Sequence, residues 1–139
     1  LGPGGQSLAA LDDLLYHRSG LLGVSGISAD SRTPLASDHP HDHEAIALFA
    51  FRIAGEVARL ATTLGGLDAL VFTAGIGEHQ PAVRAAVAGH LAWLGLVLDA
   101  AGNAANAATI SAPASRIAAL VIPTDEEQVI AEEALDVIR

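Results

Sequence analysis

The sequence predicts an α/β fold in which a small sheet is flanked by helices. An apolar pattern with helical spacing covers residues 45–64, a short β-rich run follows at 70–73, and a second helical pattern starts at Pro81. Another strand and its helix follow at 117–127 and echo the first junction. Helices and strands that alternate through short glycine links are typical of an α/β layer. From its length of 139 residues, we expect the chain to form a single domain, 1–139.

The composition argues against several classes of partner. All basic residues are arginine, and the acidic excess gives a formal net charge of −9, which opposes nucleic acid or an anionic membrane as a partner. No apolar run is long enough to span a bilayer. The chain has no cysteine, which is compatible with the cytoplasmic location that we expect. It begins at Leu1 and contains no methionine, so we expect it to be a fragment of a longer protein.

The N-terminal part predicts one helix and one ordered loop. Ser7 can cap a helix that carries leucines on one face, and Gly20 is placed to end it. Residues 19–28 mix glycine, serine and apolar residues without a helical period, so we expect an ordered loop with a short strand. The segment 30–32 (D-S-R) is either a polar turn or a fixed donor and acceptor pair for a base or a ribose.

The segment 38–44 is rich in histidine and acidic residues (D-H-P-H-D-H-E). Such side chains can bind zinc or nickel. However, His41 and His43 are two residues apart, so they point apart on a helix. Pro40 and the polar neighbours favour a solvated loop that leads into a helix, with Asp42 as the N-cap.

The helix expected at 45–64 has the clearest pattern in the chain. Large apolar residues recur at steps of three and four, which predicts that they form the buried face. These residues are Ile46, Phe49, Ile53, Val57, Leu60 and Leu64.

The first junction of strand and helix is a candidate phosphate site. A strand at 70–73 that we expect to be buried runs into Gly75 and Gly77, and Pro81 suits the first turn of the following helix. This geometry directs backbone N–H groups and a helix dipole at one point, and glycines let a ligand approach the main chain. The alternative is a tight turn that binds nothing. Gln80 stands where the dinucleotide fingerprint needs a third glycine, and the absence of lysine excludes a Walker loop.

The residues after this helix predict short strands around a loop. Residues 96–99 and 109–111 are short strand candidates, and the small and polar residues of 100–108 predict a flexible loop between them. Residues 117–122 form a second apolar strand. If the two main strands lie in one sheet, the turns at their carboxyl ends open on the same edge.

The second junction carries three acidic residues. Thr124 and Glu127 have the spacing of a capping box for the last helix. The acids can simply complement the helix dipole, which explains Asp125 and Glu127. Glu126 is left over, and its carboxylate could hold Mg²⁺ directly or through water.

Four segments together resemble the acetate kinase family, which includes propionate kinases. The string V-F-T-A-G-I-G-E-H is similar to the family's V-F-T-x-G-I-G-E-N segment. The resemblance implies a ribonuclease-H-like fold of the actin, Hsp70 and sugar kinase superfamily, of which this chain would be the C-terminal nucleotide-binding subdomain, about the last third. The four similar segments are 19–32, 68–79, 91–99 and 121–127.

The resemblance also implies a binding site for ATP and Mg²⁺. No catalytic residue falls within this chain, because the family's catalytic residues and acyl pocket belong to segments that would lie upstream. His79 and Asp125 depart from the pattern, since asparagine is common at both positions. The residues that match are Asp30, Ser31 and Arg32 as nucleotide contacts, Gly75, Ile76, Gly77, Glu78 and His79 as the ATP cradle, and Glu126 as the Mg²⁺ ligand.

The activity that the resemblance implies is phosphoryl transfer between ATP and acetate or propionate, in a homodimer. We expect these 139 residues to be inactive alone, because phosphoryl transfer depends on the missing groups. One alternative is a non-catalytic nucleotide-binding or dimerisation module. Another is a different kinase of the same superfamily.

Overall fold

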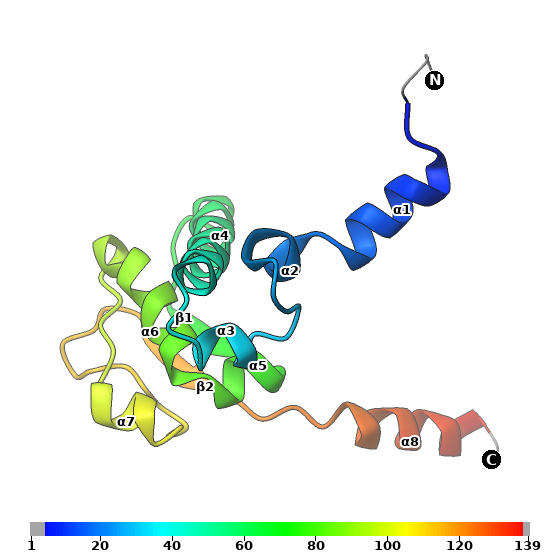
Figure 1. Ribbon diagram of the computed structural model, residues 1–139. Coiled ribbons are helices and arrows are strands. Elements are labelled where there is room, and N and C mark those ends of the chain that lie inside the picture. Colours follow the sequence, from blue (N-terminus) through cyan, green and yellow to red (C-terminus); the bar gives the residue numbers. More distant parts are fainter. Residues whose placement is uncertain (1–4, 138–139) are drawn as a thin grey trace. The chain divides into compact units, whose positions relative to one another are not determined.

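The computed structural model describes residues 5–137, except for the side chains of Glu126 and Asp136 (Figure 1). In chain order its elements are α1 (Leu8–His17), α2 (Gly20–Ser25), α3 (Arg32–Leu35), α4 (Pro40–Leu64), β1 (Ala69–Phe72), α5 (Ala74–His79), α6 (Pro81–His90), the 3₁₀ helix η1 (Ala92–Leu94), α7 (Ala100–Ala104), β2 (Ala118–Val121) and α8 (Glu126–Val137).

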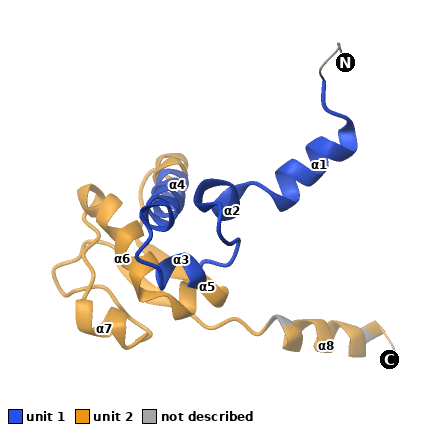
Figure 2. Ribbon diagram, viewed as in Figure 1, with its two compact units in different colours: residues 1–57 blue, residues 58–139 orange. Residues whose placement is uncertain are grey.

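The chain divides into two compact units, Leu1–Val57 and Ala58–Arg139 (Figure 2). Helix α4 runs through the division. The expectation that residues 1–139 form a single domain stays a prediction.

The first unit confirms the N-terminal helix but differs from the prediction for the segment after it. The hydroxyl of Ser7 accepts a hydrogen bond from the N–H of Ala10 at 3.2 Å, as an N-cap does. The helix ends at His17, and Gly20, with φ of +64°, opens α2 instead of closing α1. The prediction of a loop with a short strand at 19–28 was therefore wrong, because a helix of six residues is too short to show a period.

Helix α4 is confirmed, but it begins at Pro40 instead of Ala45, and its most buried positions are small. The predicted stripe of large residues is mostly half-buried, and Leu60 and Leu64 are exposed. The buried apolar positions of α4 are all alanine. They are Ala45, Ala50, Ala54 and Ala61.

Asp42 is not the N-cap of α4, because the helix has already begun two residues earlier at Pro40. Its side chain is completely buried, and neither carboxylate oxygen has a hydrogen-bond partner among the described residues. A negative charge in the first turn of a helix gains only about 0.3–1 kcal/mol from the dipole. Leaving a buried polar group without a hydrogen bond costs about 1–3 kcal/mol, so the buried carboxyl group of Asp42 is a local source of instability.

The histidines of 38–44 interact locally. The Nε2 of His43 lies 2.9 Å from the carbonyl oxygen of Ser37, and the rings of His39 and His41 meet edge to face with centroids 5.0 Å apart. Across the described residues, the structure gathers no group of three or more His, Asp or Glu side chains that could hold a metal ion. The segment therefore gives no support to the zinc or nickel alternative.

The second unit contains a parallel pair of strands, β1 and β2, whose register runs from Ala69 opposite Ala118 to Phe72 opposite Val121. Because the strands point the same way, the turns that lead into α5 and α8 both lie at the carboxyl edge of the sheet. This confirms the expectation that the two turns open on the same edge. The short strands predicted at 96–99 and 109–111 appear as single antiparallel bridges, Leu98 with Ser111 and Thr109 with Leu120.

The core of the second unit is aliphatic, as the composition predicts. Strand β1 is less buried than expected, since Val71 is 46% exposed and no residue of the strand is fully buried. The buried apolar residues come instead from α6, β2 and the segments that bridge to β2. They are Val83, Val87, Ala88, Leu91, Leu96, Ile110, Ile117, Ala119 and Val121.

Two helix starts differ from the prediction. Residues 100–108 were expected to form a loop, but Asp99 caps the short helix α7 by accepting hydrogen bonds from the N–H groups of Ala101 and Gly102. At α8 the cap is Asp125, whose Oδ1 accepts from the N–H of Gln128 at 2.9 Å, and not Thr124. Among the described residues, no helix is both long enough and apolar enough to cross a bilayer.

We predict that Asp42→Ala raises the free energy of unfolding by about 1–3 kcal/mol, because it removes a buried carboxyl group that has no hydrogen-bond partner among the described residues. Urea unfolding at neutral pH measures the change. Glu44→Ala is the matched control, since Glu44 is exposed on the same helix and gains similarly in helix propensity. If Asp42→Ala were less stable than the parent chain, the carboxylate would have to stabilise the fold.

Candidate functional site

The junction between β1 and α5 is a sharp turn into a helix. Residues 74–79 form the short helix α5, where the sequence predicted an open glycine turn. Ala74 has φ of +59°, a left-handed conformation that is uncommon for a residue with a side chain. Such conformations cluster at functional sites, because the surrounding structure must hold them in place.

The two glycines of this junction have different roles. A Cβ atom on Gly77 would lie 3.0 Å from the carbonyl carbon of Phe72, so a side chain there would push α5 slightly away from the end of β1. A Cβ atom on Gly75 would meet nothing within 4 Å, and Gly75 is exposed. Gly77 is therefore needed by the fold, whereas Gly75 leaves open space that a ligand can enter.

A buried arginine holds the end of α5. Arg84 of α6 is completely buried, and each of its nitrogens donates a hydrogen bond. Its Nη1 donates to the carbonyl oxygens of Gly77 and Glu78 at 2.8 and 2.9 Å. The Nε and Nη2 donate to the side chain and the carbonyl of Asn103 and to the side chain of Asn106, at 2.6 to 2.7 Å.

All the acceptors around Arg84 are neutral oxygens, so hydrogen bonds alone compensate the burial of this cation. Burial lowers the pKa of the Arg84 guanidinium, which nevertheless stays charged because arginine deprotonates only at very high pH. The charge lies against the last carbonyls of α5. The sequence did contain a signal for the burial of Arg84. This residue shares a helix face with Val87, Ala88 and Leu91, all of which are buried.

The carboxylate of Glu78 joins the two junctions. Its Oε1 accepts hydrogen bonds from the backbone N–H of Thr124 at 3.0 Å and from the Thr124 hydroxyl at 3.2 Å. The hydrogen bond from the Thr124 N–H is the main reason that the pKa of Glu78 is below its usual range. The segments 75–79 and 123–127, which are far apart in the sequence, therefore meet at the carboxyl edge of the sheet.

The remaining predicted residues have separate outcomes. His79 is exposed at the end of α5, and Asp125 is used as the cap of α8. The side chain of Glu126 lies outside the described residues, so its role toward Mg²⁺ stays a prediction.

In the first unit, Asp30 and Arg32 form an exposed ion pair. The Arg32 Nε lies 3.0 Å from both carboxylate oxygens, and Nη2 lies 2.5 Å from Oδ2. The hydrogen bonds from the Arg32 side chain and N–H lower the pKa of Asp30 to about 2. Ser31 between them is buried. The predicted pair of donor and acceptor therefore exists, while its role as a nucleotide contact stays a prediction.

Comparison with known proteins places the chain in a family. The model of the acetokinase family matches residues 3–132. The chain belongs to the acetokinase family. The acetokinase segment is 59% identical over 123 residues to an acetate kinase of Rhodopseudomonas palustris (strain TIE-1). The alignment covers 87% of this chain and 31% of that protein. It is 51% identical over 134 residues to an acetate kinase of Rhizobium meliloti, and that alignment covers 96% of this chain and 34% of the relative.

Solved structures of acetokinases share this fold. The crystal structure of Porphyromonas gingivalis acetate kinase superposes with a TM-score of 0.83 at 33% identity, over 97% of this chain and 35% of that one. A propionate kinase from Francisella tularensis subsp. tularensis SCHU S4 superposes with a TM-score of 0.85 at 36% identity, over 93% of this chain and 34% of that one. The predicted α/β subdomain of the actin-like superfamily is confirmed. The chain spans about a third of the length of the curated relatives that it matches.

We predict that Arg84→Met lowers the free energy of unfolding by about 3–5 kcal/mol, because it leaves several buried oxygens without donors. Arg84→Lys should lose nearly as much, since an ammonium group cannot reproduce the guanidinium fork. Urea unfolding measures both variants. The control is Arg52→Met, an exposed arginine on α4, for which a change of about 0.5 kcal/mol or less is expected. Equal effects of Arg84→Met and Arg52→Met would contradict the role given to Arg84.

We predict that the link between Glu78 and Thr124 depends on pH in a defined direction. Because the pKa of Glu78 is lowered, the link is complete above the usual glutamate range and is lost as the pH falls through the lowered pKa. The NMR shift of the Thr124 amide proton should titrate with a midpoint below that of an ordinary glutamate. The titration should vanish in Glu78→Gln, and its persistence there would assign it to another group.

Proposed function

We propose that this chain is the ATP-binding C-terminal part of a kinase that transfers a phosphoryl group between ATP and acetate or propionate, giving an acyl phosphate. One observation carries the proposal in this acetokinase segment. Its two strand-to-helix junctions meet at one edge of a parallel sheet and are joined by Glu78 and Thr124. Ligand sites in α/β folds lie at this edge.

The geometry around Gly75 fits a phosphate group. The open space over Gly75 would be filled by any side chain, and the sharp turn at Ala74 exposes the main chain there. Arg84 fixes the C-terminal end of the same short helix, α5, through the carbonyls of Gly77 and Glu78. Considered by itself, the first unit carries the ion pair of Asp30 and Arg32, an acceptor and a donor that we propose as contacts to the ribose or the base.

Mg²⁺ is the expected partner of the bound ATP, and Glu126 is the residue that would hold it. Glu126 begins α8, two residues after Thr124, which Glu78 fixes in place. Mg²⁺ held by Glu126 would supply positive charge that offsets the negative charge of the phosphoryl group during its transfer. The carboxylate of Asp125 is engaged as the cap of α8, so we do not assign it as a ligand of Mg²⁺.

Catalysis would need groups beyond those of this segment. The residues in this site position a nucleotide and hold charge, but none is placed as a nucleophile or as an acyl-binding group. We therefore propose that these 139 residues are inactive by themselves and that the parent enzyme acts as a cytoplasmic homodimer. The alternative of a non-catalytic dimerisation module is favoured by the exposed apolar residues of α4, which include Leu48, Phe51 and Leu64.

We predict that Gly75→Val weakens binding of Mg·ATP at least tenfold while leaving the unfolding midpoint unchanged, because the new side chain fills only open space. Isothermal titration calorimetry measures the affinity. Gly89→Val is the control, since Gly89 is a glycine in α6 that also has open space around it. Equal affinities of the two variants would contradict the site. If the unsubstituted chain released no heat with Mg·ATP and formed a stable dimer, the dimerisation alternative would hold.

A further inference from the structure

We propose that the second unit carries another binding site, at the amino edge of the sheet, for a small planar molecule with an anionic group. A cavity of about 540 Å³ lies there, opposite the edge that holds Gly75 and Thr124. Its volume is in the range of small-molecule sites. The groups that can recognise a ligand are Thr62, Asp68, Trp93 and Arg116, and Leu67 and Leu94 add apolar lining.

Arg116 supplies the anion-binding group. Its side chain packs on the backbone of Gly95, where a Cβ atom would lie 2.9 Å from the Arg116 Cδ. The backbone N–H of Arg116 also donates to the carbonyl oxygen of Gly95 at 2.9 Å. The stem is thus held in place, while the guanidinium is exposed and forms no ion pair with any described residue. A restrained and unpaired guanidinium is suited to a carboxylate or a phosphate.

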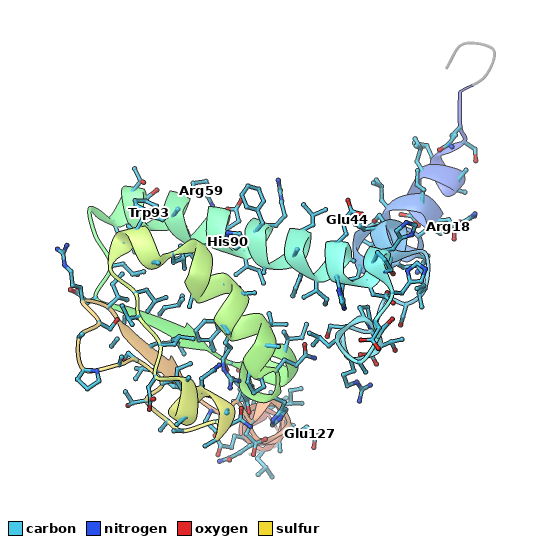
Figure 3. The ribbon with its side chains drawn as sticks, turned by 60° about the vertical axis from the view of Figure 1, so that its left-hand side comes forward. Arg18, Glu44, Arg59, His90, Trp93 and Glu127 are labelled. Atoms are coloured by element: carbon cyan, nitrogen blue, oxygen red, sulfur yellow. The ribbon has the colours of Figure 1, made fainter. Side chains whose placement is uncertain are left out.

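Trp93 supplies a flat apolar surface. It lies on η1 beside the end of α4 (Figure 3), and its side chain is 71% exposed although the neighbouring Leu91 is buried. Exposure of an indole is unfavourable, and stacking of a planar ring on it would remove that surface from water. The ring of the ligand is therefore expected to cover Trp93 while its anionic group reaches Arg116.

Asp68 and Thr62 select for a hydrogen-bond donor on the ligand. The carboxylate of Asp68 is exposed at the link before β1, and the Thr62 hydroxyl donates to the carbonyl of Ala58 at 3.0 Å, which leaves its oxygen free to accept. The chain's net charge of −9 disfavours a simple anion. The class that fits is therefore a planar aromatic ring with one carboxylate or phosphate group and an amino or hydroxyl group. Nucleoside monophosphates and aminobenzoates share this chemistry.

The fluorescence of Trp93 tests this site directly, because it is the only tryptophan of the chain. We expect saturable changes in emission on titration with AMP, with 4-aminobenzoate, or with both, and the stronger response identifies phosphate or carboxylate as the preferred anion. Adenosine and 4-aminobenzamide, which lack the charge, should bind at least tenfold more weakly. Titration of N-acetyltryptophanamide corrects for light absorbed by the ligands.

Arg116→Gln should weaken binding of the anionic probe at least tenfold, with an unchanged circular dichroism spectrum. Arg52→Gln, an exposed arginine of the first unit, is the control and should bind as the parent chain does. Gly75→Val should also bind normally, so that a failure of the proposed ATP site and a failure of this site are distinguishable. The proposal is overturned if neither anion gives a saturable change, or if Arg116→Gln binds as tightly as Arg52→Gln.

Discussion

The candidate site of the second unit depends on the hydrogen bonds of one buried guanidinium, that of Arg84. Taking a cation out of water costs several kcal/mol, and here no carboxylate bonded to it offsets that cost. Charge-assisted hydrogen bonds to the carbonyls of α5 and to Asn103 and Asn106 must do so. The position of α5 relative to α6 and α7 is therefore set by polar geometry in addition to apolar packing.

A continuous set of bonds leads from this buried charge to the surface. Arg84 holds the carbonyl of Glu78, and the carboxylate of the same residue holds Thr124 at the start of the second junction. The parallel register of β1 and β2 brings the two junctions to one edge, and Glu78 then fixes their separation. The fold thus places the open space over Gly75 and the start of α8 at the same edge of the sheet.

The sequence predicts the parts of this arrangement that have a long period or a strong local signal. Strands β1 and β2, the cap at Ser7, Pro81 at the start of α6 and the end of α4 at Leu64 belong to this group. The short helices α2, α5 and α7 were missed, because tertiary contacts such as those of Asn103 stabilise them more than local propensity does. Gly75 and Gly77 look alike in sequence, and only the nearby backbone of Phe72 separates their roles.

The close contact between Gly77 and the end of β1 has a consequence for how the protein can vary. The atoms nearest to a Cβ at Gly77 all belong to Phe72 and are mostly backbone, so the position of α5 at the end of β1 depends little on the size of side chains in the core. Replacement of aliphatic residues beneath the sheet can then alter how firmly the unit holds together without altering the shape that it offers to a ligand. The stability of the unit and the shape of this junction can therefore change separately.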